Sequence, residues 1–318
     1  MSRSGALPRA LTAALFTLLA IAACSRGAAE PDEQYVIAGG GTTGVYYNYG
    51  HHLAAAMSER LELSVLVAET NGSVDNIERV VSGAAVLGFT QGDTAVDAVI
   101  GRAPFAEPLP LEAVARVYDD FVHVVVPADS SITELQDLRG HRVSLGASGS
   151  GTEIIAQRLL YAAGVETDEL DNAALGIDGS IDAFRQGELD AFFWVGGLPT
   201  PGMSSLGASK AIRLVPVDQY VDPVNAAHGG VYRHAVVPKG MYGIPDSVSA
   251  MAVPNYLVTS ADVPEDLVND AVRVLFEERS SITRHVEAAG LLDRRRAIFT
   301  EPVRLHDGAL RYYRENKL

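Results

Sequence analysis

The chain contains one local pattern twice: a short apolar run, a glycine-rich turn, and a segment whose apolar residues have helical spacing. The first copy spans residues 35–61, with its turn at 39–44, and the second spans residues 142–163, with its turn at 146–151. Strand-like runs that alternate with helical ones are typical of α/β proteins, in which helices pack against a sheet. The pattern therefore favours an α/β fold over a helical bundle or a β-sandwich, and it predicts two lobes of similar construction.

The remainder of the chain continues this alternation. Apolar or β-branched runs predict further strands, at residues 63–68, 85–89, 113–118, 121–126, 191–195, 212–217 and 249–259. Helical spacing predicts helices between or after them, at residues 74–82, 132–138, 180–186, 264–289 and 305–314. The helix at 264–289 is expected to be long and continuous.

The two glycine-rich turns have the chemistry of anion-binding sites. A helix N-terminus offers unpaired N–H groups and the positive end of the helix dipole, and glycine lets a ligand approach the backbone closely. Gly39, Gly41 and Gly44 also match the dinucleotide-binding fingerprint, but the export signal described next argues against a nicotinamide enzyme. The second turn lacks both the lysine of a P-loop and the G-x-S-x-G pattern of a nucleophile elbow. Two facing turns are therefore expected to hold a small acid between them.

The N-terminus has the layout of an export signal. Arg3 and Arg9 precede an apolar run of about 13 residues, shorter than the about 20 needed to span a bilayer. The run ends at Cys24, the only cysteine of the chain, and the residues before it resemble the lipobox of bacterial lipoproteins. We expect a signal peptide at 1–23, lipidation of Cys24 and a flexible tether at 24–33. The alternative is ordinary cleavage that leaves a free cysteine.

Charge and composition exclude several functions. The formal net charge is −15, which argues against nucleic acid or an anionic membrane surface as a partner. The eight histidines are scattered without metal-ligand spacing, so no metal or other cofactor is expected. The sequence shows no paired carboxylates, triad or metal cluster, so we do not expect an enzyme.

Several blocks together resemble one family, the TAXI receptors (TRAP-associated extracytoplasmic immunogenic proteins), which bind solutes for tripartite transporters. The matching blocks follow the family's order and are GGTTGVYY at 40–47, Gln91-Gly92-Asp93, residues 137–165, DAFFWVGG at 190–197 and LHDGALRYYRE at 305–315. The chain departs from the family where it reads Thr94-Ala95-Val96-Asp97 after Gln91-Gly92-Asp93, and in its His306-Asp307-Gly308.

The resemblance implies the fold of a type II periplasmic binding protein, with two α/β lobes joined by two crossing segments and a ligand cleft between them. Lobe 1 is expected to comprise residues 34–124 and 254–318, and lobe 2 residues 125–253. The crossings are expected near 123–127 and near 252–259.

Candidate ligand-binding residues follow from the resemblance together with the chemistry of the turns. Donors for a carboxylate are expected at Thr42, Thr43, Ser150 and Thr152. Tyr46 is expected to cover the ligand, and Gln91 to bond an amine or a second carboxylate. The remaining candidates are Ser73, Asn76, Phe193 and Trp194. Ser73 is equally explained as an N-cap, and Phe193 and Trp194 as core residues. No arginine lies in these turns, so no bidentate clamp is evident.

The resulting functional hypothesis is a lipid-anchored receptor in the periplasm or another extracytoplasmic space. The resemblance implies glutamate, 2-oxoglutarate or a related dicarboxylate as its ligand, and a TRAP permease in the membrane as its partner. Two alternatives remain, a ligand sensor that docks on a signalling protein and, ranked last, an exported enzyme.

Overall fold

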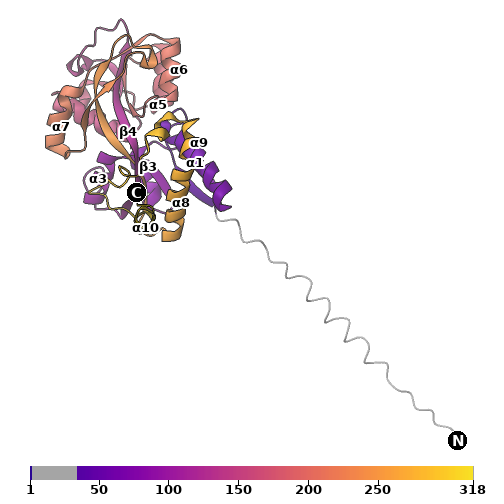
Figure 1. The fold of residues 1–318 in the computed structure, drawn as a ribbon. Helices are drawn as coiled ribbons and strands as arrows, with labels where there is room; N and C mark the ends of the chain where they lie inside the picture. Colours follow the sequence, from indigo (N-terminus) through magenta and orange to yellow (C-terminus); the bar gives the residue numbers. More distant parts are fainter. Residues whose placement is uncertain (2–33, 318) are drawn as a thin grey trace. The chain divides into compact units, whose positions relative to one another are not determined.

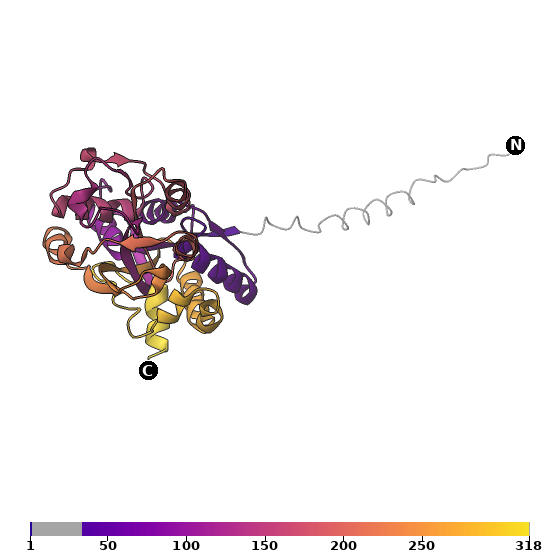
Figure 2. The ribbon, with the colours of Figure 1, turned by 90° about the horizontal axis from the view of Figure 1, so that it is seen from above.

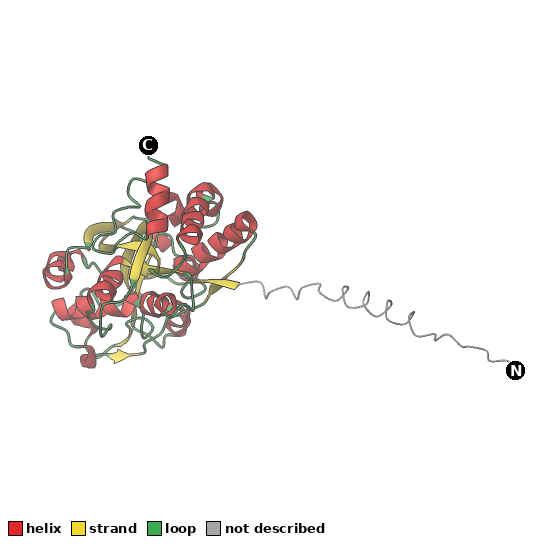
Figure 3. Ribbon diagram, turned by 90° about the horizontal axis from the view of Figure 1, so that it is seen from below, coloured by secondary structure: helices red, strands yellow, loops and turns green. Residues whose placement is uncertain are grey.

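The computed structural model describes Met1 and residues 34–317, and residues 34–318 form one compact unit. The expected signal peptide, the lipidation of Cys24 and the tether lie outside the described residues. Helices surround the strands of a mixed sheet (Figure 3). Within the described part, no helix is both long enough and apolar enough to cross a membrane. The predicted α/β class is confirmed.

The first glycine-turn unit opens a parallel half of the sheet. It contains β1 (Gln34–Ala38), α1 (Val45–Leu61), β2 (Ser64–Ala68), α2 (Ser73–Val81), β3 (Leu87–Gln91) and α3 (Gly92–Ile100). β1 pairs in parallel with both β2 and β3. Helix α3, which the sequence pattern did not predict, begins directly after β3 and ends at Gly101, whose φ of 68° suits glycine.

The second glycine-turn unit builds the other parallel half. It contains β5 (Arg142–Ser144), α4 (Gly151–Ala162), β6 (Asp171–Asn172), α5 (Ile177–Gln186) and β7 (Ala191–Gly196). β5 pairs in parallel with β6 and β7. The chain continues through α6 (Pro201–Ser209), β8 (Ile212–Leu214), α7 (Val221–His228) and β9 (Arg233–Val237). The predicted helix at 132–138 is a short 3₁₀ turn at Leu135–Leu138.

Two long antiparallel strands join these halves. They are β4 (Leu111–Pro127) and β10 (Val248–Ser260), and the sheet order is β2-β1-β3-β10-β4-β7-β5-β6. The two predicted strands at 113–118 and 121–126 are thus one continuous strand. Figure 1 shows α5, α6 and α7 towards one end of β4, and α1, α3, α8 and α10 towards the other.

Each long strand passes from one set of hydrophobic cores to another. Side chains of β4 pack with α1 and α8 up to Tyr118, and with α4 and β7 from Val122 onwards. On β10 the change falls between Val253 and Tyr256, inside the predicted crossing at 252–259. On β4 it falls at residues 119–121, before the predicted 123–127. The exact lobe boundaries stay a prediction, because residues 34–318 form one compact unit.

The C-terminal helices pack on the first half of the sheet. The expected long helix at 264–289 is instead α8 (Glu265–Glu277), α9 (Arg279–Thr283) and a 3₁₀ turn at Glu287–Leu291, and the chain ends with α10 (Asp307–Glu315). The prediction of one helix was wrong because the backbone leaves the helix at Glu278, where φ is −91° and ψ is 4°, while Ile282, Val286 and Leu292 of the following turns are buried in the same core as α8. Figure 2 shows these helices, in orange and yellow, beside the indigo α1.

Candidate functional site

A cavity of about 270 Å³ lies where the turns of the two halves face each other. The first half contributes the turns after β1 and β2 together with Tyr46, Gln91 and Asp120, and the second half contributes the turns before α4 and α5 and the end of β7. The turns lie at the carboxyl ends of parallel strands, where open α/β sheets bind ligands. The cavity is therefore the candidate functional site.

The turn before α4 supplies hydroxyl groups and close backbone. Ser150 is the N-cap of α4, and its Oγ accepts a 3.0 Å hydrogen bond from the backbone N–H of Glu153. Thr152 Oγ1 accepts one of 3.3 Å from the backbone N–H of Val195. In both side chains the hydroxyl proton is still available to a ligand. A Cβ on Gly151 would lie within 2.6 Å of Ser73 Oγ and closer still to Gln91 Oε1, so this position requires glycine.

A polar cluster forms the first half's contribution to the cavity. Asp120 Oδ2 accepts hydrogen bonds from Gln91 Nε2 at 3.4 Å and from the hydroxyl of Tyr46 at 3.3 Å. Among the described residues, Asp120 Oδ1 and Gln91 Oε1 are buried without any hydrogen-bond partner. Such atoms are rare in folded proteins and indicate a missing partner.

Burial controls the ionisation of this cluster. Asp120 is fully buried in the middle of β4, and desolvation raises its pKa to about 7, although the Asn255, Gln91 and Tyr46 side chains favour its charged form. Burial, and secondarily the nearby Asp120, also raise the pKa of Tyr46 well above its usual value. Tyr46 therefore remains a hydrogen-bond donor throughout the neutral range.

Comparison with known proteins places the chain in a family. Residues 37–316 match the family described as NMT1-like. The chain belongs to the NMT1-like family. This match covers nearly all of the described part, including every element that lines the cavity.

The NMT1-like protein is also similar in fold to several solved structures. One is described as a periplasmic transporter, with 12% identity and a TM-score of 0.54 over 90% of this chain and 93% of that one. A second is PhnD1 from Prochlorococcus marinus in complex with methylphosphonate, with 12% identity and a TM-score of 0.53 over 90% and 96%. A third is a putative L-cystine ABC transporter from Listeria monocytogenes, with 12% identity and a TM-score of 0.51 over 82% and 98%. The fold is that of type II periplasmic binding proteins, as predicted.

Seven of the ten predicted ligand-binding residues of the NMT1-like protein line the cavity: Tyr46, Ser73, Gln91, Ser150, Thr152, Phe193 and Trp194. Phe193 is buried, whereas Trp194 is partly exposed and its ring lies 3.5 Å from the Cβ that Gly44 would carry. Trp194 Nε1 donates to Thr200 Oγ1 at 3.0 Å, which fixes the ring across from the first glycine turn. Ligand contact by these residues stays a prediction.

The other three predicted residues do not line the cavity. The side-chain hydroxyls of Thr42 and Thr43 donate to the carboxylate of Asp178, so they are engaged at its edge. Asn76 is fully buried: its amide donates to the carbonyl groups of Gly39 and Phe89, and its Oδ1 accepts from Thr70 Oγ1. Asn76 therefore braces the first turn from behind.

The alternative interpretation of Ser73 as an N-cap is wrong. Gly72 is the N-cap of α2, and Ser73 is the first helical residue. Its Oγ accepts a 3.1 Å hydrogen bond from the backbone N–H of Gln91, and its side chain lines the cavity next to Tyr46.

Sequence reasoning missed Asp120 and Asp178. Asp120 lies within the strongly apolar strand β4, and a charged residue in such a run is itself a signal of a special environment. Asp178 had no comparable signal, because an aspartate near a helix start is ordinarily explained by the helix dipole.

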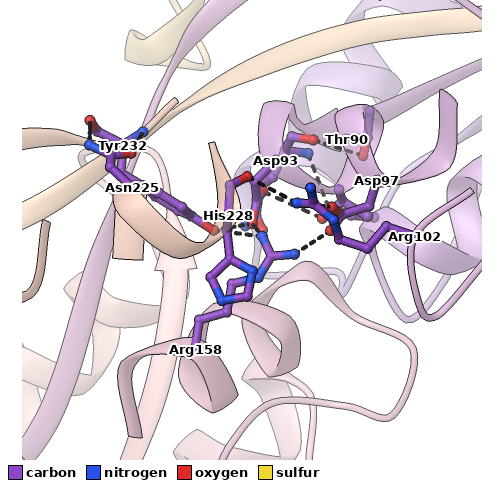
Figure 4. A network of polar contacts seen from close by, with 11 residues as sticks. Thr90, Asp93, Asp97, Arg102, Arg158, Asn225, His228 and Tyr232 are labelled. Carbon is purple, nitrogen blue, oxygen red and sulfur yellow. Dashed lines mark hydrogen bonds and ion pairs between the residues drawn. The ribbon is translucent and has the colours of Figure 1, made fainter. Parts of the chain in front are cut away.

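A second polar cluster joins the two halves outside the cavity (Figure 4). Arg158 of α4 donates to Asp93 Oδ2 at 2.9 Å and also to Asp97, both on α3. The hydroxyl of Tyr232 donates to Asp93 Oδ2 at 2.6 Å, and Arg102 donates to the carbonyl of His228 at 3.0 Å. Because Arg158 and both aspartates are buried, this cluster holds α3 against α4.

Proposed function

We propose that this NMT1-like protein is an exported receptor that encloses a small polar solute between its lobes and delivers it to a membrane transporter. The observation that carries the proposal is the cavity itself. It is lined by turns from both halves, it has the volume of a small organic molecule, and it contains buried polar atoms that lack partners among the residues that the structure describes. A site of this kind is completed by a solute.

The comparisons support the receptor role without naming the solute. Proteins of similar fold include the methylphosphonate-bound PhnD1 and the putative L-cystine transporter, and an ancestral arginine-binding protein also matches at 13% identity with a TM-score of 0.51. These descriptions cover an anion, a zwitterion and a cation. The solute must therefore be inferred from this chain's own cavity.

The partner is proposed from the block resemblance described above. The TAXI-like blocks favour a TRAP permease, whereas one protein of similar fold is described as part of an ABC transporter. Co-purification of the receptor with the permease encoded beside it, together with solute uptake in proteoliposomes, distinguishes the two. Uptake that requires an ion gradient supports the TRAP assignment, and uptake that requires ATP contradicts it.

We also propose that Cys24 carries a lipid anchor. Metabolic labelling with a fatty-acid analogue is expected to mark the wild-type protein and to leave Cys24→Ser unlabelled. Stable membrane attachment needs about two lipid chains, or one chain and a second membrane-binding signal. Because Cys24→Ser lacks the lipid anchor, the variant is expected in the soluble fraction. Membrane retention of the unlabelled variant would contradict the anchor.

The receptor role is tested with protein purified from the periplasm without unfolding. Native mass spectrometry is expected to find a retained small molecule, and small-angle scattering is expected to show a larger radius of gyration after that molecule is removed by partial unfolding and dialysis. Turnover of the bound molecule by the protein would instead indicate an enzyme.

A further inference from the structure

The carboxylates that line the cavity are not balanced by basic side chains. Three carboxylates contribute to its wall, namely Glu69, Asp120 and Asp178, whereas no lysine, arginine or histidine is among the described residues that line it. Glu69 is exposed at the edge, and Asp178 is engaged by Thr42 and Thr43. Asp120 is the carboxylate that is buried and incompletely bonded.

Two buried hydrogen-bond acceptors without partners lie at this carboxylate. Asp120 is 0% exposed and Gln91 is 2% exposed, and each presents one oxygen, Oδ1 and Oε1, that accepts no hydrogen bond within the described part. Gln91 Nε2 and the hydroxyl of Tyr46 donate to the other oxygen of Asp120, and the Asn255 side chain also favours the charged form of this carboxyl group. Within the described part, the buried Tyr118 hydroxyl and Asn255 Nδ2 are donors that also lack a partner. Asp120 Oδ1 and Gln91 Oε1 can therefore each accept a hydrogen bond from a bound solute.

The same corner adjoins the start of α4. Gln91 Oε1 lies against the backbone of Gly151, next to the hydroxyls of Ser73 and Ser150. A solute with a donor on Asp120 therefore places its neighbouring atoms beside hydroxyl protons and the positive end of a helix dipole. The cavity therefore has a place for the positive group of a small zwitterion at Asp120 and a place for its negative group at the start of α4, close to each other.

We propose that Asp120 is the specificity-determining residue of the cavity and holds the protonated amine of a solute that carries no net negative charge. This inference rests on the proposed receptor function. A charged donor satisfies a buried carboxylate more strongly than a neutral one. A dicarboxylate, in contrast, would face three carboxylates with no basic side chain to balance it, so the dicarboxylate ligand implied by the resemblance is disfavoured.

The ionisation of the buried Asp120 also supports recognition of an amine. The raised pKa of Asp120, about 7, means that this carboxyl group is partly neutral in the empty cavity at neutral pH. A cation bound beside it favours the charged form. Binding of an amine is therefore expected to release a proton from the Asp120 carboxyl group. Binding of a keto acid or a dicarboxylate would not release it.

The test uses titration calorimetry on ligand-free protein with matched probes that differ in the amine or in net charge. The pairs are L-leucine with 4-methyl-2-oxopentanoate, L-glutamine with L-glutamate, and putrescine with succinate. The solute retained during purification is also released and treated with an amine-reactive reagent. Within each pair we expect the first probe, when either binds, to bind at least tenfold more tightly, and we expect the retained solute to react.

Variants separate Asp120 from the general charge of the strand. Asp120→Asn is expected to weaken binding of the amine probe or retained solute by at least about 30-fold, because a buried charge loses its partner. The control is Asp119→Asn, which makes the same charge change one residue away but whose partner is Arg116 outside the cavity. It is expected to bind within twofold of wild type.

The outcomes are distinguishable. Tighter binding of succinate, L-glutamate or a keto acid than of its partner, or a retained solute without an amine, overturns the inference and leaves the receptor function intact. Unchanged binding by Asp120→Asn also overturns the inference about Asp120 and leaves the receptor function intact. If no probe binds and no solute is retained, the receptor function itself fails. The probe comparison requires only wild-type protein, so it stands even where a variant does not fold.

Discussion

The carboxylate of Asp178, in the first turn of α5, accepts a 3.0 Å hydrogen bond from the backbone N–H of Thr42, in the turn before α1. The hydroxyls of Thr42 and Thr43 donate to the same carboxylate. A Cβ on Gly41 would lie 2.8 Å from Ile177, so the two backbones are close as well. These contacts join residues that are 135 or 136 positions apart, and they close the edge of the cavity.

Removal of this contact is expected to loosen the closed arrangement. Asp178→Ala should weaken solute binding by about 10- to 150-fold, the effect of one hydrogen bond to a charged group. The loss should come mainly from faster dissociation, which stopped-flow fluorescence of Trp194 measures. Asp182→Ala is the control, because Asp182 lies on the same helix with an exposed side chain that forms a surface ion pair with Arg185 at 3.7 Å. Equal dissociation rates in the two variants would contradict the role of Asp178.

Arg158 is expected to be essential for stability. Arg158→Met leaves Asp93 and Asp97 buried without their cation, which should lower the free energy of unfolding by about 3–5 kcal/mol. Arg142→Met removes an exposed ion pair with Asp190 and should cost about 1 kcal/mol or less. Urea titration followed by circular dichroism measures both. Similar losses for the two variants would contradict the importance of burial.

The stability of the empty protein is expected to depend on pH through Asp120. The folded pKa of about 7 lies above the usual 3.8, so between these values the folded state retains a proton that the unfolded state has released. Stability from this group therefore falls as pH rises from about 4 to about 7, by about 1.4 kcal/mol per unit of pKa difference.

Asp120→Asn removes this dependence. Ligand-free Asp120→Asn should melt at a higher temperature than wild type at pH 8, and the two should converge near pH 4. Asp119→Asn provides the control for the same charge change on β4. A variant that is less stable than wild type at pH 8 would show that Asp120 supports the fold and would argue against a carboxylate retained for binding.

Gly151 is expected to tolerate no side chain. In Gly151→Ala the new methyl group would displace the side chains of Gln91 and Ser73 from the cavity wall, so binding should fall by at least about tenfold, by disruption of a prearranged site. Gly230→Ala is the control, because no atom lies within 4 Å of its Cβ. Calorimetry with the retained solute checks both, and unimpaired binding by Gly151→Ala would refute the close packing.

Much of the fold was predictable because its signals are local. The apolar runs and glycine turns at 35–61 and 142–163 predicted β1, α1, β5 and α4 within a few residues. Ser150 was found for the same reason, since it stands at the start of a predicted helix, whereas Gln91 was identified through the family resemblance. The helix expected at 264–289 was wrong because helical spacing of buried residues continues through Ile282 and Val286 and does not reveal that the backbone leaves the helix at Glu278.

By itself, the sequence determined the α/β class, the two similar units and most of the turn residues around the cavity, because these depend on local periodicity and on glycine. Only the tertiary structure decided that Asp120 is buried beside Gln91 and that Asp178 meets Thr42. A charged residue within β4 signals a special environment, but neither of these two contacts has a local signal, since each depends on which strands and turns become neighbours when β4 and β10 join the two halves of the sheet. The charge of the cavity, and with it the proposed preference for an amine, was therefore decided by the fold.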